Sequence, residues 1–210
     1  MIAELFDIWL RGYCIARRLG HPEIVPDGLW LEVAKPQQAG RYFANRYDPN
    51  VLSRIIRETD EPAVYIEFPG TKEQVAQLLP QGWHIRDDTY LMSASLSGGR
   101  DPEICDCVDY TLATTMLQGV ITIEARTADF GLAGSGCFVT VGNWAVFDQI
   151  LVEPEYRRRG LGSRLVRRLA NEAVVSGCSH ALLVATEDGR ALYNHLGWED
   201  ISKIVSIISA

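Results

Sequence analysis

The stretch that decides the fold is residues 152–162, which read Val-Glu-Pro-Glu-Tyr-Arg-Arg-Arg-Gly-Leu-Gly. An apolar run over residues 146–152 leads into it and predicts a strand. The residues behind it predict an amphipathic helix, with apolar side chains at Leu165, Leu169 and Ala173. A strand, a glycine turn and a helix N-terminus in line form an anion site, because backbone N–H groups and the helix dipole point at the ligand. We therefore predict that this segment binds a phosphate-bearing ligand, and in particular a pyrophosphate.

The spacing excludes two well-known phosphate loops. A Walker loop needs a lysine directly after its last glycine, and none follows Gly162. A dinucleotide loop needs a third small residue where this chain has Leu165. It also needs an acidic residue at the end of the next strand, but the strand-like run 180–185 ends in Thr186. The pattern that remains is Arg-x-x-Gly-x-Gly.

That pattern resembles the pyrophosphate loop of the GNAT superfamily of acyl-CoA-dependent N-acetyltransferases. Further along, residues 188–198 read Asp-Gly-Arg-Ala-Leu-Tyr-Asn-His-Leu-Gly-Trp and resemble the second signature of the superfamily, a helical Leu-Tyr followed by Gly-aromatic. Order, spacing and context agree over residues 144–198. The resemblance implies an α/β (α+β) fold, a GNAT-like mixed sheet built around a strand–pyrophosphate loop–helix core.

The resemblance also implies roles for individual residues. Acetyl-CoA is the expected co-substrate, and Leu151 and Val152 would offer main-chain groups to its pantetheine arm. The pyrophosphate would bind the loop residues Arg157, Arg158, Arg159, Gly160, Leu161, Gly162 and Ser163. Tyr193 matches the tyrosine that protonates the CoA thiolate in the family. A phenol held close to a thiolate can do so, although a packed helix aromatic is the alternative for Tyr193.

The general base is less clearly marked. Asp148 stands four residues before Val152 on the same predicted strand, so we expect both side chains on one face. A carboxylate among apolar neighbours costs free energy unless it is paired or solvated. A catalytic role, a salt bridge and a capping contact all satisfy that condition. Glu153 is the other candidate, and some members of the family use no side-chain base.

Composition limits the function classes. The chain has 210 residues, is 47% hydrophobic and carries a net charge of −7, which argues against nucleic acid as the main partner. Six arginines nevertheless fall between residues 157 and 168. We expect the three in the loop to contact the ligand and interpret Arg164, Arg167 and Arg168, at helical spacing, as a solvated face.

Cysteine usage and hydropathy suggest a reduced, cytoplasmic protein. The five cysteines are an odd number without a disulfide pattern, and Cys105-x-Cys107 lacks the spacing of a zinc pair. We therefore expect no metal. Residues 1–19 are helical in pattern but contain three charged positions before residue 12, unlike a signal peptide. No apolar run approaches the roughly 20 residues that span a membrane.

The pattern divides the chain into an N-terminal α/β half, residues 1–98, and an acetyltransferase domain, residues 103–210. In the first half we predict helices at 3–19, 50–58 (capped by Asn50) and 71–79 (with a Thr71/Gln74 capping signal), and strands at 29–33, 63–68 and 89–96. Residues 97–102 are the predicted linker. In the second half we predict strands at 110–115, 119–126, 132–141, 144–152, 180–185 and 201–208, a helix ending near 175 and a helix holding Tyr193.

The two halves share an order of elements, 29–96 against 146–208, and each has a Gly-Trp near the same point. Residues 36–41 stand where the second half has its glycine loop. We interpret the first half as a degenerate GNAT-like copy, with chance similarity as the alternative.

The chain departs from the family at the acceptor cleft. In typical members, two helices between the first and second strands form the wall of this cleft. Residues 115–119 leave no room for them, so we predict that the N-terminal half supplies the wall. The chain is also short after Trp198, so a sheet edge must be completed by the other half or by a second subunit, which would make a homodimer.

The predicted function is transfer of an acetyl group from acetyl-CoA to a primary amine, by direct attack in a ternary complex. A non-catalytic acyl-CoA-binding sensor is the alternative. The acceptor, a small-molecule or peptide amine, is not specified; the acidic charge would attract polyamines, aminoglycosides or lysine-rich peptides. Four aromatic residues either line an acceptor pocket or, as we expect, fill the core: Trp30, Tyr42, Phe43 and Trp144.

Overall fold

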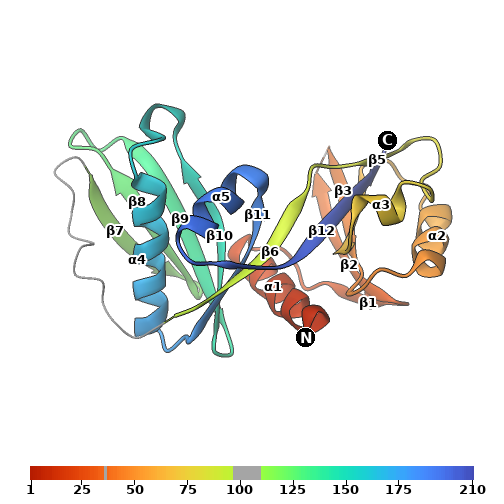
Figure 1. The fold of residues 1–210 in the computed structure, drawn as a ribbon, viewed down its shortest axis with the longest axis horizontal. Coiled ribbons are helices and arrows are strands. Elements are labelled where there is room, and N and C mark those ends of the chain that lie inside the picture. The colour runs from red at the N-terminus through yellow and green to blue at the C-terminus, as the bar shows by residue number, and fades with distance from the viewer. Residues whose placement is uncertain (36, 97–109) are drawn as a thin grey trace.

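The computed structural model describes residues 1–35, 37–96 and 110–210 and shows one twisted sheet shared by two α/β halves (Figure 1). The strand order is β1-β2-β3-β4-β12-β6-β11-β10-β9-β8-β7, and β5 pairs with β12 beside this path. The predicted linker at 97–102, and Cys105 and Cys107, lie outside the described residues.

The N-terminal half holds three helices and six strands among the described residues: α1 (Ile2–Ala16), β1 (Glu23–Val25), β2 (Gly28–Lys35), β3 (Gln38–Phe43), α2 (Pro49–Glu58), β4 (Val64–Pro69), α3 (Lys72–Val75), β5 (Trp83–Ile85) and β6 (Thr89–Ser95). The C-terminal half contains β7 (Thr111–Leu117), β8 (Val120–Arg126), β9 (Leu132–Val141), β10 (Trp144–Val152), a 3-10 turn (Pro154–Tyr156), α4 (Leu161–Val175), β11 (His180–Thr186), α5 (Glu187–His195) and β12 (Glu199–Ser209).

Three predicted helix ends are wrong. Helix α1 ends at Ala16 and not at residue 19. Asp48, not Asn50, caps α2: its Oδ1 accepts hydrogen bonds from the backbone N–H groups of Asn50 and Val51 at 3.0 and 3.2 Å. Pro49 occupies the first helical position, where its missing N–H costs nothing. The helix predicted at 71–79 is only the short α3, although the Gln74 side chain does accept from the Thr71 N–H at 2.7 Å.

The two halves exchange strands. Strand β6 comes from the N-terminal half but lies between β11 and β12, with Thr89–Ser95 antiparallel to His180–Thr186. Strand β12 comes from the C-terminal half, and its residues 204–208 pair with residues 65–69 of β4. The crossing of β6 and β12 joins the halves at the centre of Figure 1. The prediction that the other half completes a sheet edge is therefore confirmed.

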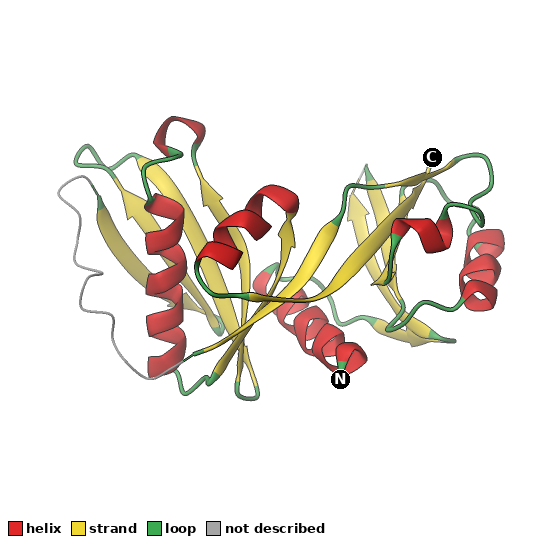
Figure 2. Ribbon diagram, viewed as in Figure 1, coloured by secondary structure: helices red, strands yellow, loops and turns green. Residues whose placement is uncertain are grey.

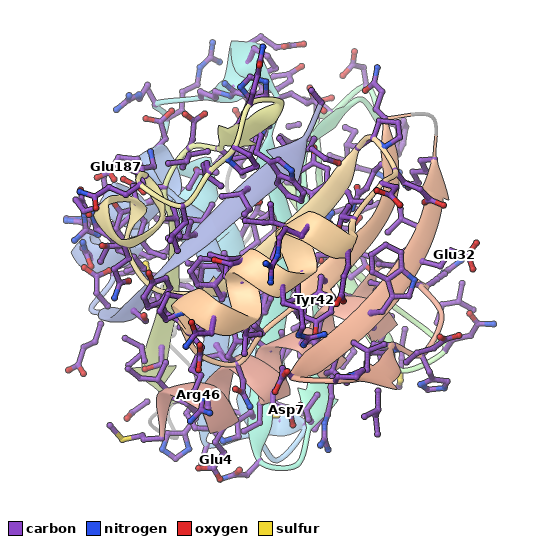
Figure 3. All side chains as sticks on the ribbon, turned by 90° about the vertical axis from the view of Figure 1, so that its right-hand side faces the viewer. Glu4, Asp7, Glu32, Tyr42, Arg46 and Glu187 are labelled. Atoms are coloured by element: carbon purple, nitrogen blue, oxygen red, sulfur yellow. The ribbon has the colours of Figure 1, made fainter. Side chains whose placement is uncertain are left out.

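Helices α4 and α1 cover opposite faces of the C-terminal sheet. Along β10, Phe147 packs in the cluster with the apolar face of α4, whereas Val146 packs in the cluster with α1. Figure 2 shows α1 between the two halves, beneath the strand crossing. Of the four aromatic residues predicted for the core, Phe43 is buried with α1, and Tyr42 of β3 is buried beside α2 in a third cluster (Figure 3). Trp144 and Trp30 are half-buried against these clusters. Trp30 and Tyr42 also line a cavity of about 520 Å³ beside α2, so the prediction holds only in part.

Candidate active site

The predicted phosphate loop joins β10 to α4. The helix begins at Leu161 after Gly160, whose φ of 79° is left-handed, and no side chain caps its N-terminus. The first N–H groups of α4 are thus available to a ligand, which suits an anion. Arg157 donates from Nε to the carbonyl oxygen of Val152 at 2.9 Å, so it also braces the loop. Arg158 and Arg159 are exposed and extend the positive charge of this end of the helix.

The arginines further along α4 differ from those of the loop. Arg168 donates to Glu172 and to the hydroxyl oxygen of Thr114, at 3.0 and 3.2 Å. Arg167 is exposed on the solvent side of the helix. The predicted solvated face thus holds for Arg167, whereas Arg168 is half-buried and bonded to its neighbours, and Arg164 is also half-buried.

Strands β10 and β11 separate next to the loop. They pair in parallel only at residues 144–146 and 180–182, although both strands continue beyond that point. On its other side β10 stays paired with β9, where Leu151 lies opposite Ser135 and Val152 opposite Gly134. The free side of Leu151 and Val152 offers main-chain groups to an extended ligand, in the way that an added strand would pair.

A β-bulge in β10 sets the faces of its side chains. The register with β9 shifts between Asp148 and Leu151, and Gln149 has a left-handed φ of 55°. The extra residue inverts the alternation. Asp148 therefore lies on the α1 face, whereas Val152 packs against the α4 core. The prediction that these two side chains share a face is wrong.

The Asp148 carboxylate is held by Arg17, the residue that ends α1. Arg17 donates from Nε to Oδ2 at 2.6 Å and from Nη2 to Oδ1 at 2.9 Å. The ion pair raises the pKa of the Arg17 guanidinium, which also lies 4.7 Å from the ring centre of Tyr13. Of the three roles that the sequence allows Asp148, the salt bridge is thus present. No signal in the sequence could identify Arg17 as its partner, because 131 positions separate the two residues.

Tyr193 lies on α5 and packs into the α4 core, with its ring centre 5.5 Å from that of Trp198. Its side chain is 8% exposed. Burial raises the pKa of the phenol, and the negative charge of Asp148 raises it further. Tyr193 thus keeps its proton at neutral pH, and it lies within electrostatic reach of Asp148.

A cavity of about 440 Å³ lies between α1 and the sheet. Tyr13, Ala16 and Arg17 line it from the N-terminal half, and Cys137 and Gln149 line it from the C-terminal half. Helix α1 thus stands over the sheet beside Asp148, where no helices between β7 and β8 are present to do so. The predicted supply of a wall by the N-terminal half matches this arrangement.

The equivalent region of the N-terminal half is closed to an anion. Strands β3 and β4 stay paired in parallel over residues 40–43 and 64–67, so they do not separate as β10 and β11 do. The N-terminus of α2 is occupied by the carboxylate of Asp48. The segment 36–41, predicted as the counterpart of the glycine loop, overlaps β3 instead; the loop before α2 is the true counterpart. The absence of a recognisable pyrophosphate turn in this half is thereby explained.

The described residues hold no cluster of metal ligands. Within residues 1–35, 37–96 and 110–210, no three His, Cys, Asp or Glu side chains gather as metal ligands would. Cys14, Cys137 and Cys178 are buried free thiols. Of the described helices, none has both the length and the apolar character of a membrane span.

Comparisons with known proteins agree with this geometry. A family model described as "Acetyltransferase (GNAT) domain" matches residues 119–200. A thialysine N-epsilon-acetyltransferase from Bos taurus is 37% identical over 59 residues, which cover 27% of this chain and 35% of the relative. The match thus spans about a third of that protein's length.

Solved structures match the whole chain. A GCN5-related N-acetyltransferase from Kribbella flavida has a TM-score of 0.70 at 14% identity, covering 100% of this chain and 95% of the other. A tandem GNAT protein from the clavulanic acid biosynthesis pathway has a TM-score of 0.57 at 15% identity, covering 99% and 96%. Residues 119–200 thus form a GNAT acetyltransferase domain. The fold of the whole chain is that of GNAT proteins, including a tandem one, as the interpretation of a second, degenerate copy requires.

Proposed function

We propose that this chain, through its GNAT acetyltransferase domain, transfers an acetyl group from acetyl-CoA to a primary amine by direct attack in a ternary complex. The observation that carries the proposal is the juxtaposition of three features: the uncapped N-terminus of α4, the exposed loop arginines and the separated strands β10 and β11. Together they fit a ligand with a pyrophosphate and an extended arm.

The chain's own residues would hold the co-substrate as follows. The N–H groups of Leu161, Gly162 and Ser163, with Arg158 and Arg159, would bind the pyrophosphate. The free edge of β10 at Leu151 and Val152 would bind the arm. A Cβ at Gly162 would come within 3.2 Å of Leu192, so the glycine also allows α4 and α5 to approach each other. When bound, acetyl-CoA supplies an activated thioester whose cleavage releases a thiolate.

Asp148 and Tyr193 would carry out two of the three proton transfers of the reaction. Asp148 would accept the proton of the incoming ammonium, since a carboxylate has acceptor sites beyond the two that Arg17 uses. Tyr193 would donate its phenolic proton to the sulfur as the C–N bond forms and the C–S bond breaks. Its raised pKa means that the phenol is protonated before transfer but is a weaker acid than an exposed tyrosine, so the role depends on close contact with the sulfur. The nitrogen loses its second proton to solvent as the amide forms. Asp148 then releases its proton to solvent, and the Tyr193 phenolate takes one back.

The name of the Bos taurus relative supports a small amine as the acceptor, since that protein is a thialysine N-epsilon-acetyltransferase. The direct mechanism uses no metal. In the ternary complex the amine would lie in the cavity between α1 and the sheet, here called the α1 cavity. Arg17, the partner of Asp148, lines this cavity.

The proposal is tested by calorimetric titration of the full chain with acetyl-CoA, with CoA and ATP as comparisons, followed by assays of thiol release with amines. We expect micromolar binding of acetyl-CoA and CoA and much weaker binding of ATP. The double substitution Arg158→Glu/Arg159→Glu should weaken binding about 100-fold or more, since each of the two charged contacts contributes about 1.5–3 kcal/mol. Arg167→Glu, the same charge reversal beyond the loop, should not. Failure of acetyl-CoA to bind would refute the proposal, and tight binding without thiol release would favour a sensor.

A further inference from the structure

The α1 cavity has charges of one sign only. Four of its lining residues are charged, and all four are basic: Arg17, Arg18, Lys35 and Arg41. They come from the end of α1 and from strands β2 and β3 of the N-terminal half. This is a local reversal in a chain whose net charge is −7.

Two of the four cations are already neutralised. Arg17 is paired with Asp148, and Arg41 donates to the buried Glu67 at 2.8 Å. Within the described ranges, Arg18 and Lys35 have no carboxylate partner, although both line the cavity. Four positive charges against the two carboxylates leave two positive charges without a counterion.

The backbone holds Arg18 in a defined place. Its φ of 53° is left-handed, and its N–H donates to the carbonyl oxygen of Ile15 at 3.1 Å, which closes the last turn of α1. The cavity also exposes polar side chains that accept or donate hydrogen bonds, among them Gln38, Thr122 and Gln149. Arg17 lines the cavity and holds the Asp148 carboxylate, so the proposed catalytic carboxylate lies directly behind the cavity wall.

We infer that the acceptor is a small primary amine that carries an anionic group, a carboxylate or a phosphate, which Arg18 and Lys35 bind in the α1 cavity. The inference rests on the proposed function, because it assigns the acceptor of the same reaction. The amine end lies at Asp148 and the anion at the two uncompensated cations. A cavity of about 440 Å³ is within the range of small-molecule sites.

The local charge outweighs the net charge in selecting the acceptor. Charges beyond about 8–10 Å are largely screened at physiological salt, whereas those lining a cavity act at contact distance. A polyamine or a lysine-rich peptide, which the net charge of −7 would attract, meets repulsion inside this cavity. The acidic character of the chain as a whole is therefore a poor guide to the acceptor.

The test uses amines in matched pairs, with and without the anion: L-lysine against cadaverine for a carboxylate, and O-phosphoethanolamine against ethanolamine for a phosphate. Each is titrated calorimetrically into the full chain saturated with CoA. We expect the anionic member of at least one pair to bind about tenfold or more tightly than its partner, the effect of one charge-assisted contact. The pair that discriminates identifies the anion.

Variants assign the effect to the cavity. Arg18→Glu/Lys35→Glu should abolish the discrimination, and Arg18→Gln/Lys35→Gln should reduce it. Arg86→Glu, an exposed arginine outside the cavity lining, should preserve it. Equal or tighter binding of the amines without the anion, no binding of any probe, or discrimination that survives the double reversal would overturn the inference.

The outcome is separable from that of the proposed function. If acetyl-CoA fails to bind, the proposed function fails, and the same titrations into the unliganded chain still decide the charge preference of the cavity. If cadaverine or ethanolamine is acetylated in preference to its anionic partner, the proposed function stands and the inference falls.

Discussion

The contact between α1 and the sheet offers a sharp test of how the N-terminal half serves the site. Gly12 lies against Val146 of β10, and a Cβ at position 12 would stand 2.4 Å from the Cβ of Val146 and 2.5 and 2.6 Å from its two methyl carbons. Ordinary carbon–carbon contacts are about 3.5–4.0 Å. In Gly12→Ala the helix must therefore withdraw by about 1 Å or more.

The magnitude follows from three contributions. Overpacking of a tight contact costs about 1–3 kcal/mol. Alanine offsets about 0.8–1 kcal/mol of that, because it favours a helix over glycine. Withdrawal also stretches the 2.6 and 2.9 Å contacts between Arg17 and Asp148, whose side chains are 42% and 14% exposed, and loss of this pair costs about 1 kcal/mol. We expect a net loss of up to about 3 kcal/mol, with each kcal/mol lowering Tm by about 2–4 °C.

Urea unfolding measures the stability, and kinetics with a fixed amine measure the site. Acetyl-CoA affinity should be unchanged, because the loop lies on the other side of the sheet, whereas kcat/KM for the amine should fall. The matched control is Gly20→Ala, since a Cβ at Gly20 meets nothing within 4 Å. If Gly12→Ala behaved like Gly20→Ala in both measurements, the assignment of α1 as the wall of the acceptor cavity would be refuted.

The remaining expectations concern the site and the strand exchange. Tyr193→Phe should lower turnover about 100-fold with acetyl-CoA affinity retained; unchanged turnover would exclude the acid role. Because the pKa of Tyr193 is raised, deprotonation of Tyr193 should reduce turnover only above about pH 10. If turnover instead decreased at a lower pH, and Tyr193→Phe removed that decrease, the assignment would be contradicted. Calorimetry should give one acetyl-CoA per chain, and two would show that the N-terminal half is open. Residues 103–210 expressed alone lack β6 and α1 and should be insoluble or inactive, whereas a soluble, fully active fragment would contradict the proposed dependence on the N-terminal half.

The strand–loop–helix segment was predictable because its signals are local. The glycines and arginines of residues 157–162, the apolar strand before them and the helical spacing after them are all contiguous in sequence. Each part favours the same local structure without help from distant residues. The fold class and the position of Tyr193 on a helix were expected from the resemblance of two contiguous segments, residues 157–162 and 188–198, to GNAT motifs.

The faces of β10 were not predictable from the same information. A bulge depends on the register with the neighbouring strand, and the apolar residues around Asp148 do not show where the extra residue stands. The partner of Asp148 is also hidden, because Arg17 is brought to it only by packing of α1 across the halves. Local composition could not distinguish a salt bridge at Asp148 from a catalytic role or a capping contact.

The loss of a phosphate site from the N-terminal half has two independent physical causes. At the start of α2, Asp48 places a negative charge on the same N–H groups that an anion would need. In the sheet, β3 and β4 stay paired over residues 40–43, so no free strand edge is present to receive an extended ligand. Removing the carboxylate alone would leave the strands closed, and one substitution cannot restore the site.

The N-terminal half supplies elements that the C-terminal half does not have. It supplies β6, which pairs with both β11 and β12, and it supplies α1, which carries Arg17 to Asp148. It also supplies every charged residue that lines the α1 cavity. A half that had become only a spacer would be free to lose those cations, whereas a half that binds the acceptor would not. If Arg18 and Lys35 bind the acceptor as proposed, the positive lining of the α1 cavity makes the N-terminal half part of the binding site and not only a structural support.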